Sequence, residues 1–218
     1  TRRIVGIEAL LRWPNRDGPL LRPELFIPAA EDCGLIPQFT QYVLERVAID
    51  APRLVAIHPD AYVSINLSSV DLHSEEIVAS LKKLLQTRGI EPRNIIVEAT
   101  EHSLLDPTRA RTIVASIREL GIRVAIDDFG TGYSSLSHLA TLRTDYLKID
   151  KVFIDTVETD SVTSQVALHV IRLAESLDLK IIGEGVETEV QASFLSEHGV
   201  QFAQGWLFHE AMPFEKTL

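Results

Sequence analysis

The stretch VAIDDFGTGYSS, residues 124–135, starts as a short apolar strand whose apolar part ends in two adjacent carboxylates, Asp127 and Asp128. Like charges repel, and burial penalises the ionised form of both side chains. A loop of Gly, Thr, Tyr and Ser follows, so the two carboxylates mark the point where the strand ends. An apolar strand that ends in this way needs positive charge nearby to compensate them.

Similar apolar runs occur along the whole chain and alternate with longer amphipathic segments. They are rich in Ile and Val and mostly lack polar alternation, as expected for strands that are covered on both faces. The amphipathic segments carry apolar residues at helical spacing, as in residues 113–120. Two helix starts are predicted, one by Asp106 before Pro107 and one by a capping box of Thr188 with Gln191. The seven predicted strands are residues 4–10, 61–67, 94–100, 124–128, 145–149, 180–184 and 201–206.

Repeated strand and helix units predict a parallel sheet with helices outside it. Seven strands are one fewer than a (β/α)8 barrel requires, and 218 residues are slightly fewer than the roughly 250 that are typical of such barrels. The sequence also begins almost directly on a strand. We therefore expect an α/β fold, a (β/α)8 TIM-like barrel whose first strand is missing. No linker or repeat divides residues 1–218, which predicts a single domain that is incomplete at its N-terminal end.

The composition narrows the class of protein. A formal charge of −10 argues against a sequence-independent binder of DNA or RNA, because such proteins need basic surfaces. No apolar run approaches the roughly 18 to 20 residues that span a bilayer, and no secretory signal opens the sequence. The single cysteine, Cys33, favours a reducing compartment. We expect a cytoplasmic domain, or the cytoplasmic part of a membrane-bound parent protein, with Cys33 packed as a small buried hydrophobe.

Polar side chains gather at the carboxyl ends of the predicted strands, where the active site of such a barrel lies. One polar strand end is explained by solvation or by a turn. A functional side chain at or near the end of every predicted strand is instead typical of an active site. These side chains are Glu8, Asn66, Glu98, Asp127 with Asp128, Lys148, Glu184 and Gln204.

The chemistry of these groups suits hard divalent cations. Carboxylate and amide oxygens without His or Cys are typical ligands of Mg²⁺ or Mn²⁺, and the absence of HExxH and CxxC argues against zinc sites of those kinds. Such cations would compensate Asp127 and Asp128. Successive strand residues point to opposite faces, so these two share a site only where the strand turns into its loop, or by reaching different ions.

A pair of cations would also define a reaction. Two ions about 3.5–4 Å apart support phosphodiester hydrolysis by an activated bridging water. Lys148 would then orient the water or stabilise phosphate charge, and Glu184 would serve as the base. A purely structural role for Lys148, as a counter-ion of the carboxylates, remains open.

Seven motifs resemble those of the EAL domain family in order and in approximate spacing. Members of that family are metal-dependent phosphodiesterases that cut cyclic di-GMP to linear 5′-pGpG. The resemblance implies a (β/α)8-like barrel whose first strand runs antiparallel to the others, and that strand has no counterpart before residue 4 here. The motifs are EALLRW (8–13), NLS (66–68), EATE (98–101), DDFGTGYSSL (127–136), KID (148–150), EGVE (184–187) and QGW (204–206).

The resemblance also implies a role for individual residues. Asp127 would bridge two cations, with Asp128 at the second, and Lys148 and Glu184 would be the catalytic residues that handle the attacking water. Arg12 would contact a substrate phosphate, which suits a planar guanidinium. The implied metal ligands are Glu8, Asn66, Glu98, Asp127 and Asp128. The implied substrate-binding residues are Arg12, Leu10, Gln204 and Asp150.

The loop at residues 129–135 would be the family's mobile loop, which links dimerisation to metal binding. Glu101 and Glu187 would anchor it, although a Gly-rich connection needed only for a tight turn is an equally good interpretation of the residues alone. The implied partners are cyclic di-GMP, a second copy of the chain, and sensory or GGDEF-type domains of a larger parent protein. We expect no contact with a nucleic-acid polymer or a membrane. Ca²⁺ is expected to inhibit.

Two other functions remain open from the sequence. The first is a receptor that binds cyclic di-GMP without cutting it; such proteins usually lose metal-binding or base residues, whereas all of them are present here. The second is a different metal-dependent barrel enzyme, such as an enolising lyase, which also pairs Mg²⁺ with a lysine base. The EALLRW and DDFGTGYSS motifs argue against the lyase.

Overall fold

The computed structural model describes residues 2–15, 18–104, 107–130, 142–157 and 162–217. Across these ranges, seven strands form one sheet in which each strand pairs in parallel with its neighbours in chain order. All seven predicted strands are confirmed. Their bounds are Gly6–Ala9 (β1), Tyr62–Leu67 (β2), Ile95–Thr100 (β3), Arg123–Phe129 (β4), Tyr146–Ile149 (β5), Lys180–Gly183 (β6) and Phe202–Ala203 (β7).

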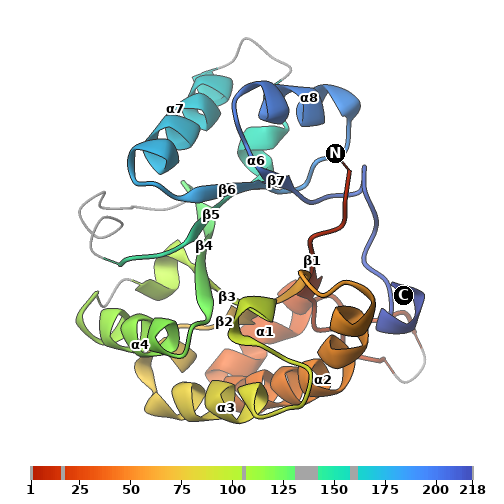
Figure 1. The fold of residues 1–218 in the computed structure, drawn as a ribbon, viewed down its shortest axis with the longest axis vertical. Coiled ribbons are helices and arrows are strands. Elements are labelled where there is room, and N and C mark those ends of the chain that lie inside the picture. Colours follow the sequence, from red (N-terminus) through yellow and green to blue (C-terminus); the bar gives the residue numbers. More distant parts are fainter. Residues whose placement is uncertain (1, 16–17, 105–106, 131–141, 158–161, 218) are drawn as a thin grey trace.

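Helices cover the outer side of the curled sheet (Figure 1). None of those in the described ranges is both long enough and apolar enough to cross a membrane. The α-helices are Pro23–Asp32 (α1), Ile36–Ile57 (α2), Glu75–Leu85 (α3), Pro107–Glu119 (α4), Lys151–Ile154 (α6), Val162–Ser176 (α7) and Glu189–Glu197 (α8). Short 3-10 helices are Asp71–His73 (η1), Pro92–Asn94 (η2), Glu101–Leu104 (η3) and Phe214–Lys216 (η4).

The sheet is a half-barrel with two free edges. Among the described residues, β1 pairs only with β2 and β7 only with β6, so the expected TIM-like barrel with one strand missing is confirmed. An open cavity of about 1830 Å³ is lined by residues of both edge strands, including Ile7 and Phe202, and by Leu54 of α2.

The strand β7 is shorter than residues 201–206, which were predicted as a strand. Gly205 has a φ of 151°, and a Cβ at this position would lie 2.2 Å from backbone atoms of Val186. The chain therefore leaves the strand after Ala203 and passes close over the connection between β6 and α8, where only glycine fits.

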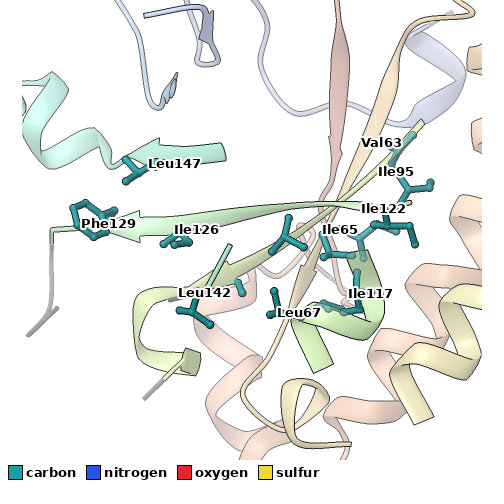
Figure 2. Close-up of a cluster of buried hydrophobic side chains, with 14 of the residues drawn as sticks. Val63, Ile65, Leu67, Ile95, Ile117, Ile122, Ile126, Phe129, Leu142 and Leu147 are labelled. Carbon is teal, nitrogen blue, oxygen red and sulfur yellow. The ribbon is translucent and has the colours of Figure 1, made fainter. Parts of the chain in front are cut away.

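Alternation along the strands divides the apolar side chains into two clusters. Val63, Ile65 and Leu67 of β2 pack against the helices in the larger cluster, which Figure 2 shows together with Ile117 of α4. The side chains between them point into the barrel. A smaller cluster fills the barrel at the amino ends of the strands: Tyr62, Ile96, Ala125, Tyr146, Ile182 and Phe202.

The expectation that Cys33 is buried is wrong. Phe26 and Ala30 are the buried residues of α1, and one further turn would have placed residue 33 on the same face. The helix instead ends at Asp32, and Gly34 turns the chain in the left-handed conformation with a φ of +68°. Cys33 is therefore exposed.

One of the two predicted helix starts lies in the described structure and is confirmed. Thr188 and Gln191 form the expected capping box of α8: the hydroxyl of Thr188 accepts from the backbone N–H of Gln191, whose side chain accepts from the backbone N–H of Thr188. The other predicted cap, Asp106 before Pro107, lies outside the described residues.

Candidate active site

The side chains that point into the barrel change from apolar to polar toward the carboxyl ends of the strands. On β3, for example, Ile96 belongs to the inner apolar cluster and Glu98 follows two residues later. The same two-residue step repeats on the other strands, because every second side chain of a strand shares a face. The pairs beyond β3 are Ala125 and Asp127, Tyr146 and Lys148, Ile182 and Glu184, and Phe202 and Gln204.

Lys148 lies at the centre of this polar layer and is 1% exposed. Its Nζ atom is 2.6 Å from Glu184 Oε1, 2.7 Å from Glu98 Oε2, 3.1 Å from Asp127 Oδ1 and 3.9 Å from Glu8 Oε2. The lysine therefore supplies the positive charge that the adjacent carboxylates require. One ammonium group nevertheless faces four carboxylates, so the site has an excess of negative charge.

This excess is visible in the pKa values. Burial raises the pKa of the Glu98 carboxyl to about 7; Lys148 opposes the rise, and the charges of Glu8 and Asp127 add to it. Burial likewise raises the pKa of Glu184 well above its usual value, again against the effect of Lys148. Burial alone would lower the pKa of Lys148, but the surrounding carboxylates outweigh it and hold the pKa well above its usual value.

Asp127 and Asp128 share one site because the strand is distorted between them. The register of β4 with β5 shifts between Ile126 and Phe129, and Asp128 adopts the left-handed conformation with a φ of 54°. Oxygen atoms of Asp127, Asp128 and Glu184 consequently lie within 4.8 Å of one another. The expectation that the strand turns into its loop at this point is wrong, because β4 continues to Phe129, which pairs with Ile149; an irregularity within the strand brings the two carboxylates together instead. Left-handed backbone is costly for a residue other than glycine and is concentrated at functional sites.

A hydrogen-bonded chain closes the polar layer across the open side of the barrel. The Nε2 atom of Gln204 donates to Glu8 Oε2 at 3.0 Å and to Glu184 Oε1 at 2.8 Å. The Nδ2 atom of Asn66 donates to the other oxygen of Glu8 at 2.8 Å. Side chains thus connect β7 to β1 and β1 to β2, although the backbones of β7 and β1 do not pair in the described structure.

The donor set fits hard divalent cations. Its members are carboxylates with one amide, they converge from several strands, and their negative charge exceeds that of the one lysine. The amide oxygen of Asn66 takes no part in the bond to Glu8, which its nitrogen donates. The residues of this layer that could hold such cations are thus Glu8, Asn66, Glu98, Asp127 and Asp128, with Glu184 beside the two aspartates.

The four predicted substrate-binding residues lie around this layer. Leu10 and Arg12 follow β1 and border the same open cavity as Gln204. Leu10 is 44% exposed, and Arg12 donates from Nη1 to the backbone oxygen of Leu11 at 2.8 Å. Asp150 accepts from the backbone N–H of Val152 as the N-cap of α6, and its side chain is hydrogen-bonded to Asp128.

Asp150 contributes to the charge around Asp128. Burial raises the pKa of Asp128 to about 6, and the charges of Asp127 and Asp150 add to that rise. The structure thus brings Asp150 to the edge of the carboxylate layer, where its charge adds to the excess of negative charge.

The two predicted loop anchors differ in their surroundings. Glu101 is buried, and its Oε2 atom accepts from the backbone N–H of Gly130 at 3.1 Å, at the start of the predicted mobile loop. Glu187 is exposed and forms an ion pair with Lys151 at 2.9 Å. Residues 131–135 of the loop lie outside the described structure, so both anchoring roles stay predictions.

One buried polar group near the site was missed from the sequence. Asp71 is 5% exposed and binds Ser68, the residue that ends the NLS motif. The spacing Ser-x-x-Asp at residues 68–71 is typical of side-chain to backbone bonds in a turn and was the available signal.

The sequence model described as "EAL domain" matches residues 1–211 of this chain. The chain belongs to the EAL domain family. This EAL domain is 43% identical over 216 residues to the "Probable cyclic di-GMP phosphodiesterase PdeB" of Escherichia coli (strain K12), covering 99% of this chain and 41% of the relative. It is 37% identical to the "Bifunctional diguanylate cyclase/cyclic di-GMP phosphodiesterase MucR" of Pseudomonas aeruginosa, covering 99% of this chain and 32% of MucR. The chain thus spans less than half the length of either relative.

Solved structures agree with this assignment. The EAL domain matches "PaMucR Phosphodiesterase, c-di-GMP complex" with a TM-score of 0.94 and 36% identity, over 99% of this chain and 88% of that chain. It matches "Structure of EAL Enzyme Bd1971 - cAMP and cyclic-di-GMP bound form" with a TM-score of 0.92 and 29% identity, over 98% of this chain and 59% of that chain.

Proposed function

We propose that this EAL domain hydrolyses cyclic di-GMP to linear 5′-pGpG with the help of Mg²⁺ or Mn²⁺. The observation that carries the proposal is the convergence of the carboxylates from β1, β3, β4 and β6 around one buried ammonium group. The names of PdeB and MucR support the same substrate, and so does the solved MucR structure, which is a complex with cyclic di-GMP. Family membership argues against the enolising lyase.

The residues divide into two groups of cation ligands in this proposal. Glu8, Asn66, Glu98 and Asp127 would hold one cation, and Asp127 with Asp128 would hold a second, with Glu184 nearby. When bound, the two cations would supply an activated hydroxide and would withdraw charge from the phosphate. The distortion of β4 supports the bridging role of Asp127, because it brings the oxygens of both aspartates into one site.

Lys148 and Glu184 would handle the attacking water. Glu184 would accept a proton from that water, and burial, which raises the pKa of its carboxyl, makes it a stronger base than an exposed glutamate. Lys148 lies 2.6 Å from Glu184 and would hold the carboxylate in place. The water oxygen would bond to phosphorus as the bond from phosphorus to the 3′-oxygen breaks. That oxygen would take up a proton, and the phosphate would remain on the 5′-oxygen.

Arg12 would bind a non-reacting phosphate oxygen of the substrate, because its guanidinium group offers several donors in one plane. Arg12 lies in the segment that follows β1 and lines the open cavity, which is compatible with that role. Leu10, Gln204 and Asp150 would complete the substrate site.

We also propose that the domain acts inside a longer signalling protein. The chain spans 41% of PdeB and 32% of MucR, whose name includes a diguanylate cyclase activity. Sensory or GGDEF-type domains are the corresponding expectation for the parent of this domain. The homodimer stays a prediction, to be checked by light scattering of the purified domain.

Chromatography of cyclic di-GMP incubated with the protein tests the proposed function. With Mg²⁺ or Mn²⁺ we expect linear pGpG as the first product, and none when EDTA removes the cations. If no product forms while calorimetry shows that cyclic di-GMP binds, the domain is a receptor and the hydrolase proposal is wrong.

Replacing Asp127 with asparagine is expected to weaken Mn²⁺ loading at both positions, because one bridging carboxylate serves both cations. Loss of a residue that only hydrogen-bonds to a metal ligand already lowers metal affinity or activity by about 10–100-fold. Loss of a ligand itself should therefore weaken Mn²⁺ binding by more than about tenfold. Calorimetric titration with Mn²⁺ measures it. Asp155→Asn is the matched control, since Asp155 is an exposed partner of Lys151. An unchanged Mn²⁺ titration of Asp127→Asn would refute the bridging role.

Replacing Mg²⁺ with Ca²⁺ is expected to stop cleavage. Ca²⁺ takes about six to eight oxygen ligands at longer distances, so it would hold the reacting water poorly. Initial rates of pGpG formation at equal cation concentrations measure the effect, and calorimetry checks that cyclic di-GMP still binds. Equal rates with Ca²⁺ and Mg²⁺ would contradict this prediction.

A further inference from the structure

A second buried polar cluster lies between α2 and the segment that follows β2, at the start of η1. The Oδ2 atom of Asp71 accepts three hydrogen bonds: from the backbone N–H of Ser68 at 2.9 Å, from its hydroxyl at 2.7 Å and from the hydroxyl of Thr40 at 2.9 Å. Asp71 is 5% exposed and Thr40, in α2, is 8% exposed. One carboxylate oxygen therefore joins the segment after β2 to the neighbouring helix.

No cation pairs with Asp71 among the described ion pairs, so hydroxyl and amide donors alone stabilise this buried carboxylate. Burial of a charge without a counter-ion is costly in free energy. Hydrogen bonds to a charged acceptor are shorter and stronger than bonds between neutral groups. Burying this carboxylate thus costs more free energy than a neutral turn would, and its hydrogen bonds hold Ser68 firmly against α2.

The held segment begins two residues after a proposed cation ligand. The strand β2 ends at Leu67, and Asn66 lies opposite Glu98 in the register of β2 and β3. The carboxylates beside Asn66 are held by Lys148 or Gln204, whereas the described contact of the Asn66 side chain is its bond to Glu8. Because an asparagine side chain is short, the backbone at the end of β2 determines where its oxygen lies.

We propose that Asp71 is a positioning residue: it fixes the end of β2 against α2 and thereby holds the Asn66 oxygen at the cation site. The inference rests on the proposed function, because it takes Asn66 as a cation ligand. Thr40 and Ser68 act with Asp71 as the other two members of the cluster. None of the three side chains has a described contact with the carboxylate layer, so the effect travels through the backbone of residues 66–68.

The test compares Asp71→Ala with Asp71→Asn by calorimetric titration of Mn²⁺ without substrate. All three bonds end on one oxygen, so the asparagine oxygen can replace it and is expected to preserve Mn²⁺ affinity. Alanine removes the acceptor, and we expect Mn²⁺ to bind about tenfold more weakly, as for other indirect supports of a metal ligand. Turnover of cyclic di-GMP at saturating Mn²⁺ should change much less than the Mn²⁺ concentration that gives half the maximal rate.

Asn94→Ala is the matched control for a general loss of stability. Asn94 is 1% exposed, and its Nδ2 atom donates to the backbone oxygen of Ala61 at 2.8 Å, so it supports β2 at the opposite end of the strand. This variant should melt at a lower temperature and keep its Mn²⁺ affinity. Equal weakening of Mn²⁺ binding by Asn94→Ala and Asp71→Ala would overturn the proposal, and so would unchanged binding in Asp71→Ala.

Thr40→Val keeps the proposal testable if Asp71→Ala does not fold. It removes one of the three donors at nearly constant volume and is expected to weaken Mn²⁺ binding in the same direction by a smaller factor. If Asp71→Ala does not fold, and the Thr40→Val protein folds and binds Mn²⁺ with normal affinity, the proposal is overturned. Since these titrations contain no substrate, a wild-type protein that binds Mn²⁺ but does not cleave cyclic di-GMP would refute the proposed function alone.

Discussion

Cleavage of cyclic di-GMP is expected to fall by about 10²–10⁴-fold when Glu184 is replaced with alanine, the range that a positioned acid or base contributes. Glu184 accepts from Lys148 at 2.6 Å and from Gln204 at 2.8 Å, so its carboxylate is already held in a fixed position. Binding of cyclic di-GMP should largely survive, because the proposed phosphate contact of Arg12 remains. Rates of pGpG formation and calorimetric binding of the substrate measure the two effects separately.

Glu189→Ala is the control for this change. Glu189 lies five residues later at the start of α8, is exposed and pairs with Arg2, so its loss should leave the rate unchanged. A rate for Glu184→Ala close to that of the wild type would refute its role as the base. Equal losses of substrate binding and of rate would instead assign it to binding.

Replacing Lys148 with methionine is expected to affect both stability and cleavage. The change removes the ammonium group that lies among Glu98, Glu184 and Asp127 and leaves these carboxylates without their buried counter-ion. Breaking a buried ion pair by removing one partner costs about 3–5 kcal/mol, so the free energy of unfolding in EDTA should fall by that amount. Added Mn²⁺ should restore more stability to this variant than it adds to the wild type.

Denaturant unfolding with EDTA and with Mn²⁺ measures this effect, and the rate of pGpG formation should drop by about 10²-fold or more at saturating Mn²⁺. Lys180→Met is the control, because Lys180 is an exposed lysine at the opposite end of the sheet. If Lys148→Met keeps wild-type stability in EDTA, Lys148 is not the counter-ion of the carboxylates. If it loses stability but retains full cleavage, the role of Lys148 is purely structural.

The sequence predicted the strands and most of the polar layer because both depend on local patterns. Apolar runs such as residues 94–100 fold as strands wherever helices can cover them, and the structure places β3 at Ile95–Thr100. Since parallel strands end at the same edge, Glu98 and Lys148 were expected to lie close together, and they are 2.7 Å apart. The spacing of Glu98 and Lys148 in the sequence cannot predict the distance between their side chains, because that distance depends on how strongly the sheet curls.

Other features depend on backbone geometry that residue types do not specify. Asp128 adopts the left-handed conformation, which aspartate tolerates better than most residues but which the residue type alone does not predict. The one hint in the sequence was that two adjacent carboxylates can share a site only if the strand is distorted there. Cys33 was predicted to be buried from the apolar character of its helix, but where α1 ends decided its exposure. Asp71 was missed because its partner Thr40 is 31 residues away in the sequence.

The central claim is that the carboxylate layer around Lys148 is completed by two divalent cations. The most direct measurement is a calorimetric titration of Mn²⁺ into the wild-type domain, followed by electron paramagnetic resonance of the saturated protein. We predict two Mn²⁺ ions per chain and a spectrum with magnetic coupling between them. A single uncoupled Mn²⁺, or no binding at all, would contradict the claim.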